Sequence, residues 1–185
     1  MSAAEKRRVE RGYLMIESVR IEYVRIPAVE TGHPVLVLLH EGLGCAAMWR
    51  DFPARLASLT GAEVFAYSRP GYGDSTPVEL PRPSTYMHHE GKVVLPQVLD
   101  AAGIRCCVLI GHSDGGSIAI LHASDPSGAR ARGLVLIAAH VFNEPVTMQS
   151  IAAAKREYEH SDLRARLSRY HGANVDVAFR GWNDV

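Results

Sequence analysis

The sequence predicts an α/β domain of three layers, and three observations carry this prediction. The chain has 185 residues, of which 47% are hydrophobic, and this is enough to build the core of one ordinary domain. Its strongest apolar runs are short and continuous, as in strands that a parallel sheet buries on both faces. Stretches with helical spacing separate these runs, which is the pattern of repeated βαβ units.

The opening of the chain differs from the rest of it. Residues 13–16 and 19–26 are β-rich and are joined by Glu17 and Ser18, so we expect an antiparallel hairpin. Four parallel strands are then predicted over residues 35–39, 64–67, 106–110 and 134–139. Helices are predicted over residues 48–58, 87–102 and 116–123. Pro96 must either start or kink the second of these helices.

After residue 139 the pattern changes. Residues 146–170 are rich in Ala, Arg, Glu and Leu and predict two helices. Residues 175–179 alternate like a short strand. We therefore expect an incomplete core of six strands over residues 1–142 and a helical segment over residues 143–185.

Charge and apolar runs exclude several classes of protein. Twenty basic and twenty acidic residues cancel, and no like-charged run suggests a nucleic-acid arm or a membrane anchor. No apolar run approaches the roughly 18 residues of a membrane span. Met1–Arg8 is basic but lacks the apolar stretch of a secretory signal. A small-molecule or protein partner is therefore expected.

The three cysteines indicate a reducing compartment. Cys45, Cys106 and Cys107 cannot all pair, and the last two are adjacent within an apolar run. Buried free thiols in a cytoplasmic protein fit this pattern best. No metal-ligand spacing is present, and no cofactor is expected.

The most informative motif is Gly111-His-Ser-Asp-Gly115, between a predicted strand and a small-residue helix. This context is typical of a nucleophile elbow, in which a strained turn lifts a serine hydroxyl above the sheet. Gly111 and Gly115 leave the clearance that the turn needs. Ser113 is therefore the candidate nucleophile, and the alternative is a glycine-rich turn with a serine cap.

A second turn, His40-Glu-Gly-Leu-Gly44, follows the strand predicted at residues 35–39. In an acyl-transfer site such a turn supplies one oxyanion N–H group, and the residue after the nucleophile supplies another. We assign these donors to Gly42 and Asp114. The alternative is a tight turn without a ligand.

The same glycines allow a different hypothesis. Residues 42–47 match G-x-G-x-x-A, which also occurs in dinucleotide-binding domains. Against this, the next strand ends in Ser68-Arg69 rather than in a ribose-binding acid, and the motif follows a hairpin.

Together the two turns resemble those of the α/β-hydrolase family, and the resemblance extends from Tyr13 to about Val185. The segment from Ser68 to Ser75 is similar to the family's Asp-Arg-Pro-Gly-x-Gly-x-Ser loop, with Ser68 in place of the usual Asp. The final helices resemble the start of the family's cap. Glu41 replaces a glycine; its carboxylate either repels a developing oxyanion or points away and holds the turn.

The resemblance implies a serine hydrolase that acts on an ester, thioester or related acyl or carbon–carbon substrate through an acyl-enzyme. It also implies an acid and a histidine after Ser113. His122, His140, His160 and His171 each fit an exposed or packed histidine better than a base, and Glu144 is the candidate acid. Candidates to line the pocket are His40, Glu41 and His112.

Because no convincing catalytic acid or histidine follows Ser113, the chain resembles the N-terminal two-thirds of such an enzyme. A sheet that stops at residues 134–139 leaves an open apolar edge. We therefore expect either a completing chain or self-association at this edge, or an inactive fragment. The alternative functions are a non-catalytic binding module and a dinucleotide-binding domain.

Overall fold

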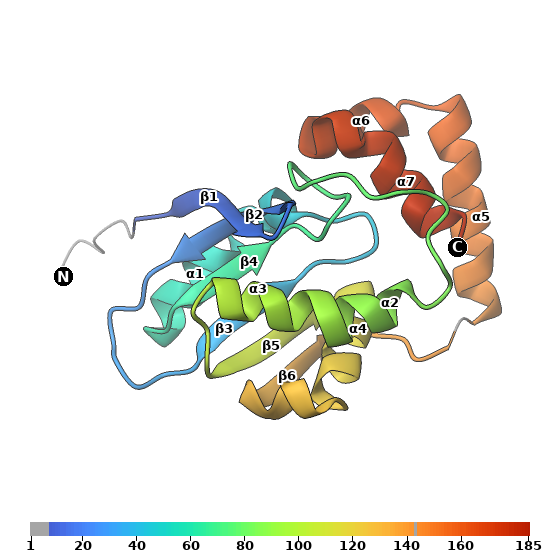
Figure 1. Cartoon of the computed structure of the whole chain (residues 1–185). Helices are drawn as coiled ribbons and strands as arrows, with labels where there is room; N and C mark the ends of the chain where they lie inside the picture. Colours follow the sequence, from blue (N-terminus) through green and yellow to red (C-terminus); the bar gives the residue numbers. More distant parts are fainter. Residues whose placement is uncertain (1–7, 143) are drawn as a thin grey trace.

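The computed structural model describes residues 8–142 and 144–185, and one mixed sheet forms its centre (Figure 1). The six strands stand in the order β1-β2-β4-β3-β5-β6. Their bounds are β1 (Glu10–Ile16), β2 (Val19–Ile26), β3 (Val35–Leu39), β4 (Val64–Tyr67), β5 (Cys107–His112) and β6 (Ala131–Ile137). β1 and β2 pair as an antiparallel hairpin, and β4, β3, β5 and β6 run parallel. The predicted α/β class and the hairpin are confirmed.

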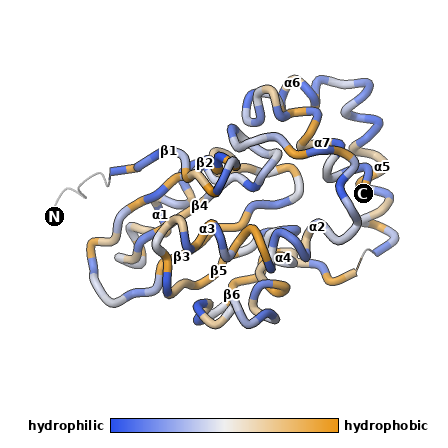
Figure 2. Tube along the Cα trace, viewed as in Figure 1, coloured by the Kyte–Doolittle hydropathy of each residue, from blue (hydrophilic) through white to orange (hydrophobic). Residues whose placement is uncertain are grey.

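Helices cover both faces of the sheet, which gives the predicted three layers (Figure 1). On one face α3 (Leu95–Ala101) and α4 (Asp114–Ala123) pack against the strands, and on the other face lies α1 (Phe52–Thr60). Hydrophobic residues concentrate in the central strands and in α3 and α4 (Figure 2). β4 is buried along its whole length, which explains its continuous apolar run.

Two of the predicted helices begin at other residues than predicted, and a proline lies near the start of an observed helix in each. The helix predicted at residues 48–58 is in fact a 3₁₀ turn, η1 (Ala46–Trp49), followed by α1. Pro53 lies in the first turn of α1, where its missing N–H costs no hydrogen bond. The segment predicted at residues 87–102 consists of α2 (Tyr86–His89), a π-helical turn η2 (Glu90–Val94) and α3. Pro96 lies in the first turn of α3, as one of the two predicted placements requires.

The last strand also differs from its prediction. After a 3₁₀ turn, η3 (Pro126–Arg130), β6 begins at Ala131 and ends at Ile137, whereas the apolar run predicts residues 134–139. The strand ends there because Ala138 has a φ of 49° and leaves the extended conformation.

Helices make up most of residues 145–183. This segment comprises α5 (Pro145–His160), α6 (Leu163–His171), a 3₁₀ turn η4 (Gly172–Asn174) and α7 (Val175–Asn183), which share an apolar cluster of their own. The strand-like prediction for residues 175–179 is wrong. Val175, Ala178 and Phe179 are buried at helical spacing, so one face of α7 packs inward.

Two predictions fall on residues outside the described ranges, and one prediction about a cysteine is wrong. The prediction about a secretory signal rests mainly on residues 1–7, and the domain boundary falls at Asn143; both lie outside the described residues. Within the described ranges, none of the helices has the length and apolarity of a membrane span.

Cys45 and Cys107 are buried and free, and burial raises the pKa of both thiols to about 11. Cys106 is exposed, contrary to prediction, because it precedes the buried strand.

Candidate active site

Ser113 occupies a sharp turn between β5 and α4. Its φ is 50° and its ψ is −118°, a conformation that costs a non-glycine residue free energy. The amide N–H of Ser113 donates to the carbonyl of Ile137 in β6 at 2.8 Å, which fixes the turn to the sheet. The side chain is half-buried. The strained turn that the motif predicts is therefore present.

Glycines let the elements around Ser113 approach at backbone distance. A Cβ atom on Gly111 would lie 2.5 Å from the carbonyl carbon of Gly115. On Gly115 it would lie 2.5 Å from the carbonyl carbon of Leu39 and 2.8 Å from the carbonyl oxygen of His40. Such distances leave no room for a methyl group. The start of α4 is thus packed directly against the end of β3, beside the turn that contains Gly42.

Two backbone N–H groups at these turns have no partner. Gly42 and Asp114 are both buried, and neither amide donates a hydrogen bond within the described parts of the chain. A buried donor without an acceptor costs about 1–3 kcal/mol, so such groups are rare in folded proteins. A ligand oxygen that accepted from both would remove this cost. The assignment of these residues as oxyanion donors remains a prediction that this geometry favours.

The carboxylate of Glu41 is held at the second turn. It lies 2.5 Å from the position of a Cβ on Gly44, and its Oε2 is 3.5 Å from Nδ1 of His112. The backbone carbonyl of Glu41 also accepts the N–H of Gly44 at 3.1 Å. Of the two alternatives for Glu41, the structure supports the one in which it holds the turn.

The same contact argues against the dinucleotide hypothesis. In that hypothesis the glycines from Gly42 to Gly44 leave space for a pyrophosphate. Here the carboxylate of Glu41 fills the space at Gly44 and would repel phosphate. The turn leads into the short 3₁₀ turn η1, not directly into an α-helix whose N-terminus could bind an anion.

His40 connects the two loops beside the site. Its ring is 1% exposed, Nδ1–H donates to the carbonyl of Glu41 at 2.7 Å, and Nε2 accepts the N–H of Arg69 at 3.1 Å. Burial, followed by the nearby Arg69 charge, holds the pKa of His40 well below its usual value. His40 is therefore neutral and bridges the two loops, and its place in a pocket lining stays a prediction.

The side chain of Asp114 belongs to a buried polar cluster that the sequence analysis missed. Its Oδ2 accepts the hydroxyl of Tyr86 at 2.8 Å and lies 4.0 Å from Nη2 of Arg69. Its Oδ1 lies 3.8 Å from Nε2 of His140. Of the downstream histidines, His140 is thus the one that contacts the residue beside Ser113. The Arg-Pro-Gly that opens the long loop was the available signal for Arg69.

The other candidates for acid and base lie elsewhere. His122 is buried and its Nδ1 bonds to the carbonyl of Gly91 at 3.0 Å, while His160 is exposed. Glu144 is exposed at the start of α5, and its carboxylate makes no hydrogen bond or ion pair within residues 8–142 and 144–185. In the same ranges no side chain is hydrogen-bonded to the hydroxyl of Ser113.

The profile of the Alpha/beta hydrolase family matches residues 36–184. The chain belongs to this family. No curated protein sequence matches it.

Solved structures of hydrolases share its fold. A CIB-like hydrolase from Thermoplasma acidophilum is 19% identical, with a TM-score of 0.61 over 83% of this chain and 82% of that one. A bacterial membrane phospholipase A is 22% identical, with a TM-score of 0.67 over 95% and 60%. A structure from a study of carboxylesterases of Nitrososphaera gargenis is 19% identical, with a TM-score of 0.66 over 93% and 66%. The chain thus spans between 60% and 82% of these structures.

Ser68, which stands where this family usually has Asp, is completely buried. Its Oγ accepts the N–H of Ala46 at 2.9 Å and donates to Oε2 of Glu22 at 2.6 Å. The same Glu22 oxygen accepts the N–H of Asp74 at 3.1 Å. In this chain a carboxylate from β2 therefore anchors the start of the long loop.

The C-terminal helices are attached to that loop by two buried polar side chains. Nδ1 of His171 accepts the N–H of Gly73 at 3.0 Å, and Nε2–H donates to the carbonyl of Leu43 at 3.0 Å. Nδ2 of Asn174 donates to the carbonyls of Gly73 and Ser75 at 3.1 and 2.6 Å. Burial lowers the pKa of His171, which keeps the ring neutral and able to accept.

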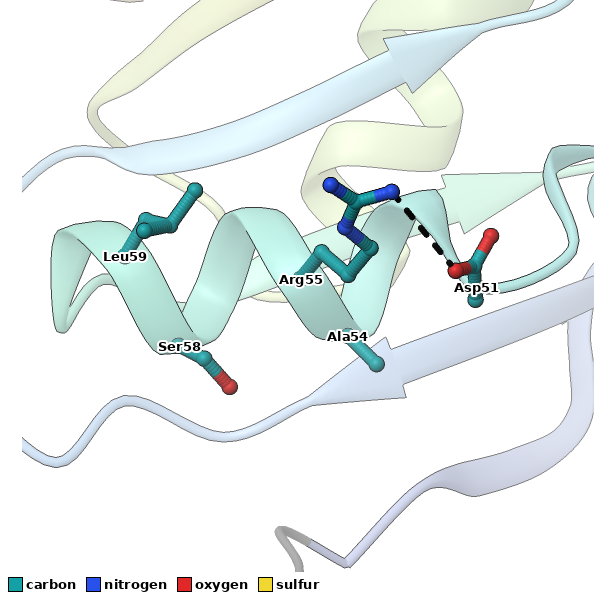
Figure 3. A pocket seen from close by; sticks show the side chains of 5 residues that line it. All are labelled: Asp51, Ala54, Arg55, Ser58 and Leu59. Atoms are coloured by element: carbon teal, nitrogen blue, oxygen red, sulfur yellow. Dashed lines mark ion pairs between the residues drawn. The ribbon is translucent and has the colours of Figure 1, made fainter. Parts of the chain in front are cut away.

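Two surface hollows lie away from Ser113. One is formed on α1, where Arg55 and Asp51 form an exposed ion pair at 3.9 Å (Figure 3). The other lies among α5, α6 and α7. In the part of the chain that the structure describes, no cluster of three metal-ligating side chains occurs.

Proposed function

We propose that this protein is a serine hydrolase that cleaves carboxylic esters, thioesters or related acyl and carbon–carbon bonds. The observation that carries the proposal is the strained turn at Ser113, beside the buried residues Gly42 and Asp114, whose N–H groups donate to no acceptor among the described residues. This arrangement suits a reaction in which a serine attacks a carbonyl group. Family membership and the fold shared with esterase and phospholipase structures support the same class.

The proposed reaction has two stages. Oγ of Ser113 forms a bond to the carbonyl carbon, and the π electrons move to the carbonyl oxygen, which the two N–H groups stabilise. One such donor contributes about 2.7–4 kcal/mol to transition-state stabilisation. Collapse of this intermediate expels the leaving group. Water then hydrolyses the acyl-enzyme.

The proton of Ser113 requires a base, which we propose comes from a segment that adds a strand to β6. Val135, Leu136 and Ile137 are 46%, 44% and 41% exposed, so both faces of this strand lack cover in the described chain. An apolar edge of this kind pairs readily with another strand. The added segment would carry an imidazole and a carboxylate, and a second copy of the chain is the alternative occupant.

Substrate selection would come from the helices of residues 144–185, acting as a cap, and from the loop that precedes α2. The polar bonds of His171 and Asn174 support this division, since they join the helices to that loop. The buried free thiols support the expected cytoplasmic location.

A fluorophosphonate probe tests the proposal. Wild-type protein should form a covalent adduct that peptide mass spectrometry places on Ser113, and Ser113→Ala should form none. Ser124→Ala is the matched control, because Ser124 is exposed on the turn after α4 and, within the described residues, its hydroxyl bonds only to the carbonyl of Leu121. A folded wild-type chain that stays unlabelled would contradict hydrolase activity of this chain alone and would favour a non-catalytic fragment or binding module.

A further inference from the structure

Trp182 in α7 lies against the turn that contains Gly42. A Cβ atom on Gly42 would be less than 3.0 Å from Nε1 and Cδ1 of the indole and 3.0 Å from Cε2. The edge of the ring that carries the N–H group, not the benzo ring, therefore faces this turn. The contact joins residues that are far apart in the sequence.

The indole N–H of Trp182 is unused. Within the described residues it donates to no acceptor, and it is not among the fully buried orphan groups, whereas the N–H of Trp49 is. Trp182 thus places a free donor beside the free N–H of Gly42. One ligand oxygen at this corner can accept from both donors.

Several contacts fix the position of this ring. Phe179 packs edge-on against it, with ring centroids 6.1 Å apart. Gly181 brings α7 close to the core, since a Cβ there would lie 2.8 Å from Nε of Arg82. Asn174, at the start of α7, holds the helix to the carbonyl of Ser75. The donor is therefore held in place before any ligand binds.

We propose that Trp182 is a catalytic residue whose indole N–H is a third hydrogen-bond donor to the oxyanion, beside the amides of Gly42 and Asp114. The inference rests on the proposed function and extends it to the helical segment. No covalent bond of Trp182 changes. As Ser113 bonds to the acyl carbon, the carbonyl oxygen gains negative charge and accepts the indole N–H. The substrate must then present this oxygen toward α7.

Indole NMR tests this interaction directly. The chain has two tryptophans, so the ¹⁵N-labelled protein has two indole N–H signals, and Trp182→Phe assigns them. A phenylboronate adduct of Ser113 carries a tetrahedral anion that mimics the intermediate. We expect its formation to move the Trp182 signal downfield and to leave the Trp49 signal in place. An adduct that leaves the Trp182 signal unchanged would overturn the inference.

Labelling rates give a second measurement. Trp182→Phe keeps an aromatic wall but removes the donor, and should slow fluorophosphonate labelling by about 10²-fold, the lower end of the effect of losing an oxyanion donor. Trp49→Phe is the control, because Trp49 stacks on Phe52 with ring centroids 5.4 Å apart. This variant should be labelled at the wild-type rate. Equal rates in all three proteins would contradict the role of Trp182.

A double-mutant cycle of unfolding free energies distinguishes failure of this inference from failure of the proposed function. Gly42→Ala should destabilise the wild-type protein, because the new methyl group meets the indole, and Trp182→Ala should relieve most of that effect. Independent effects of the two substitutions would overturn the contact. If the cycle shows coupling but folded wild-type protein forms no adduct, the proposed function fails, and the oxyanion role of Trp182 fails with it.

Discussion

The two regions that meet near Ser113 are held in place by different forces. At the elbow, backbone packs directly on backbone, and Gly115 leaves no room for a methyl group beside Leu39. The helices of residues 144–185 reach the core through packing of Trp182 and Leu43 and also through the buried polar side chains of His171 and Asn174. The comparison teaches that the turn at Ser113 is positioned by steric exclusion, whereas the attachment of the C-terminal helices also depends on a few hydrogen bonds and on a neutral imidazole.

The largest expected effect comes from breaking the steric packing. Gly115→Ala places a methyl group against the carbonyl of Leu39, and should lower the free energy of unfolding by about 3 kcal/mol. This exceeds the roughly 1 kcal/mol that Ala gains over Gly in a helix. Urea denaturation measures the change. Gly133→Ala is the control, since its Cβ would have Val108 no closer than 3.9 Å; a similar loss there would contradict a steric cause at Gly115.

The attachment of the helices should depend on pH. The folded-state pKa of His171 is lowered, so the unfolded chain binds more protons in the window below the ordinary value of about 6.5. The stability that His171 contributes is therefore present above that pH and is lost as the pH falls through its folded-state pKa. The hydrogen bond to the Leu43 carbonyl and the carboxylates of Glu41 and Glu22 raise the pKa of His171 and oppose part of this effect.

His171→Phe tests this dependence. It should cost about 1–3 kcal/mol at pH 7.5, because the N–H of Gly73 and the carbonyl of Leu43 lose their partner. It should also make the loss of stability between pH 7.5 and 5.5 smaller than in the wild type, and urea denaturation at both pH values measures this. The exposed His160→Phe should keep wild-type stability at pH 7.5. An unchanged pH dependence in His171→Phe would show that His171 does not titrate on unfolding.

A smaller, local effect is expected at Asn174. Asn174→Ala removes two hydrogen bonds to the long loop and should cost about 1–2 kcal/mol, with faster amide exchange in α6 and α7. Asn183→Ala is a matched control, since Asn183 donates to Ile151 within the helical segment itself. Hydrogen-exchange mass spectrometry distinguishes the two. Equal exchange of α6 and α7 in both variants would argue that Asn174 does not join the two regions.

The smallest effect on folding concerns the open edge. Leu136→Lys, at a half-exposed position of β6, should change the free energy of unfolding by less than about 0.5 kcal/mol. It should weaken self-association or completion at this edge, because a charged side chain blocks pairing. Met15→Lys, at an exposed position of β1, should leave association unchanged. Sedimentation velocity compares the three proteins, and equal association would exclude β6 as the interface.

Local pattern predicts the strands well and the helix ends less well. β3 and β4 have the predicted bounds, because a continuous apolar run between polar turns has few alternative conformations. The prediction for residues 175–179 is wrong because a run of five residues can match both a strand and a helical period. Burial of Phe179 against Tyr158, at 3.7 Å between ring centroids, selects the helix.

By itself, the sequence determined the turn at Ser113 and the sheet around it, because glycine spacing and apolar runs act over neighbouring residues. Only the tertiary structure decided that Asp114 meets Tyr86 and that Trp182 meets Gly42. These contacts join segments that are distant along the chain. Their side chains carry no local signal of the partner, since packing, not spacing, selects it.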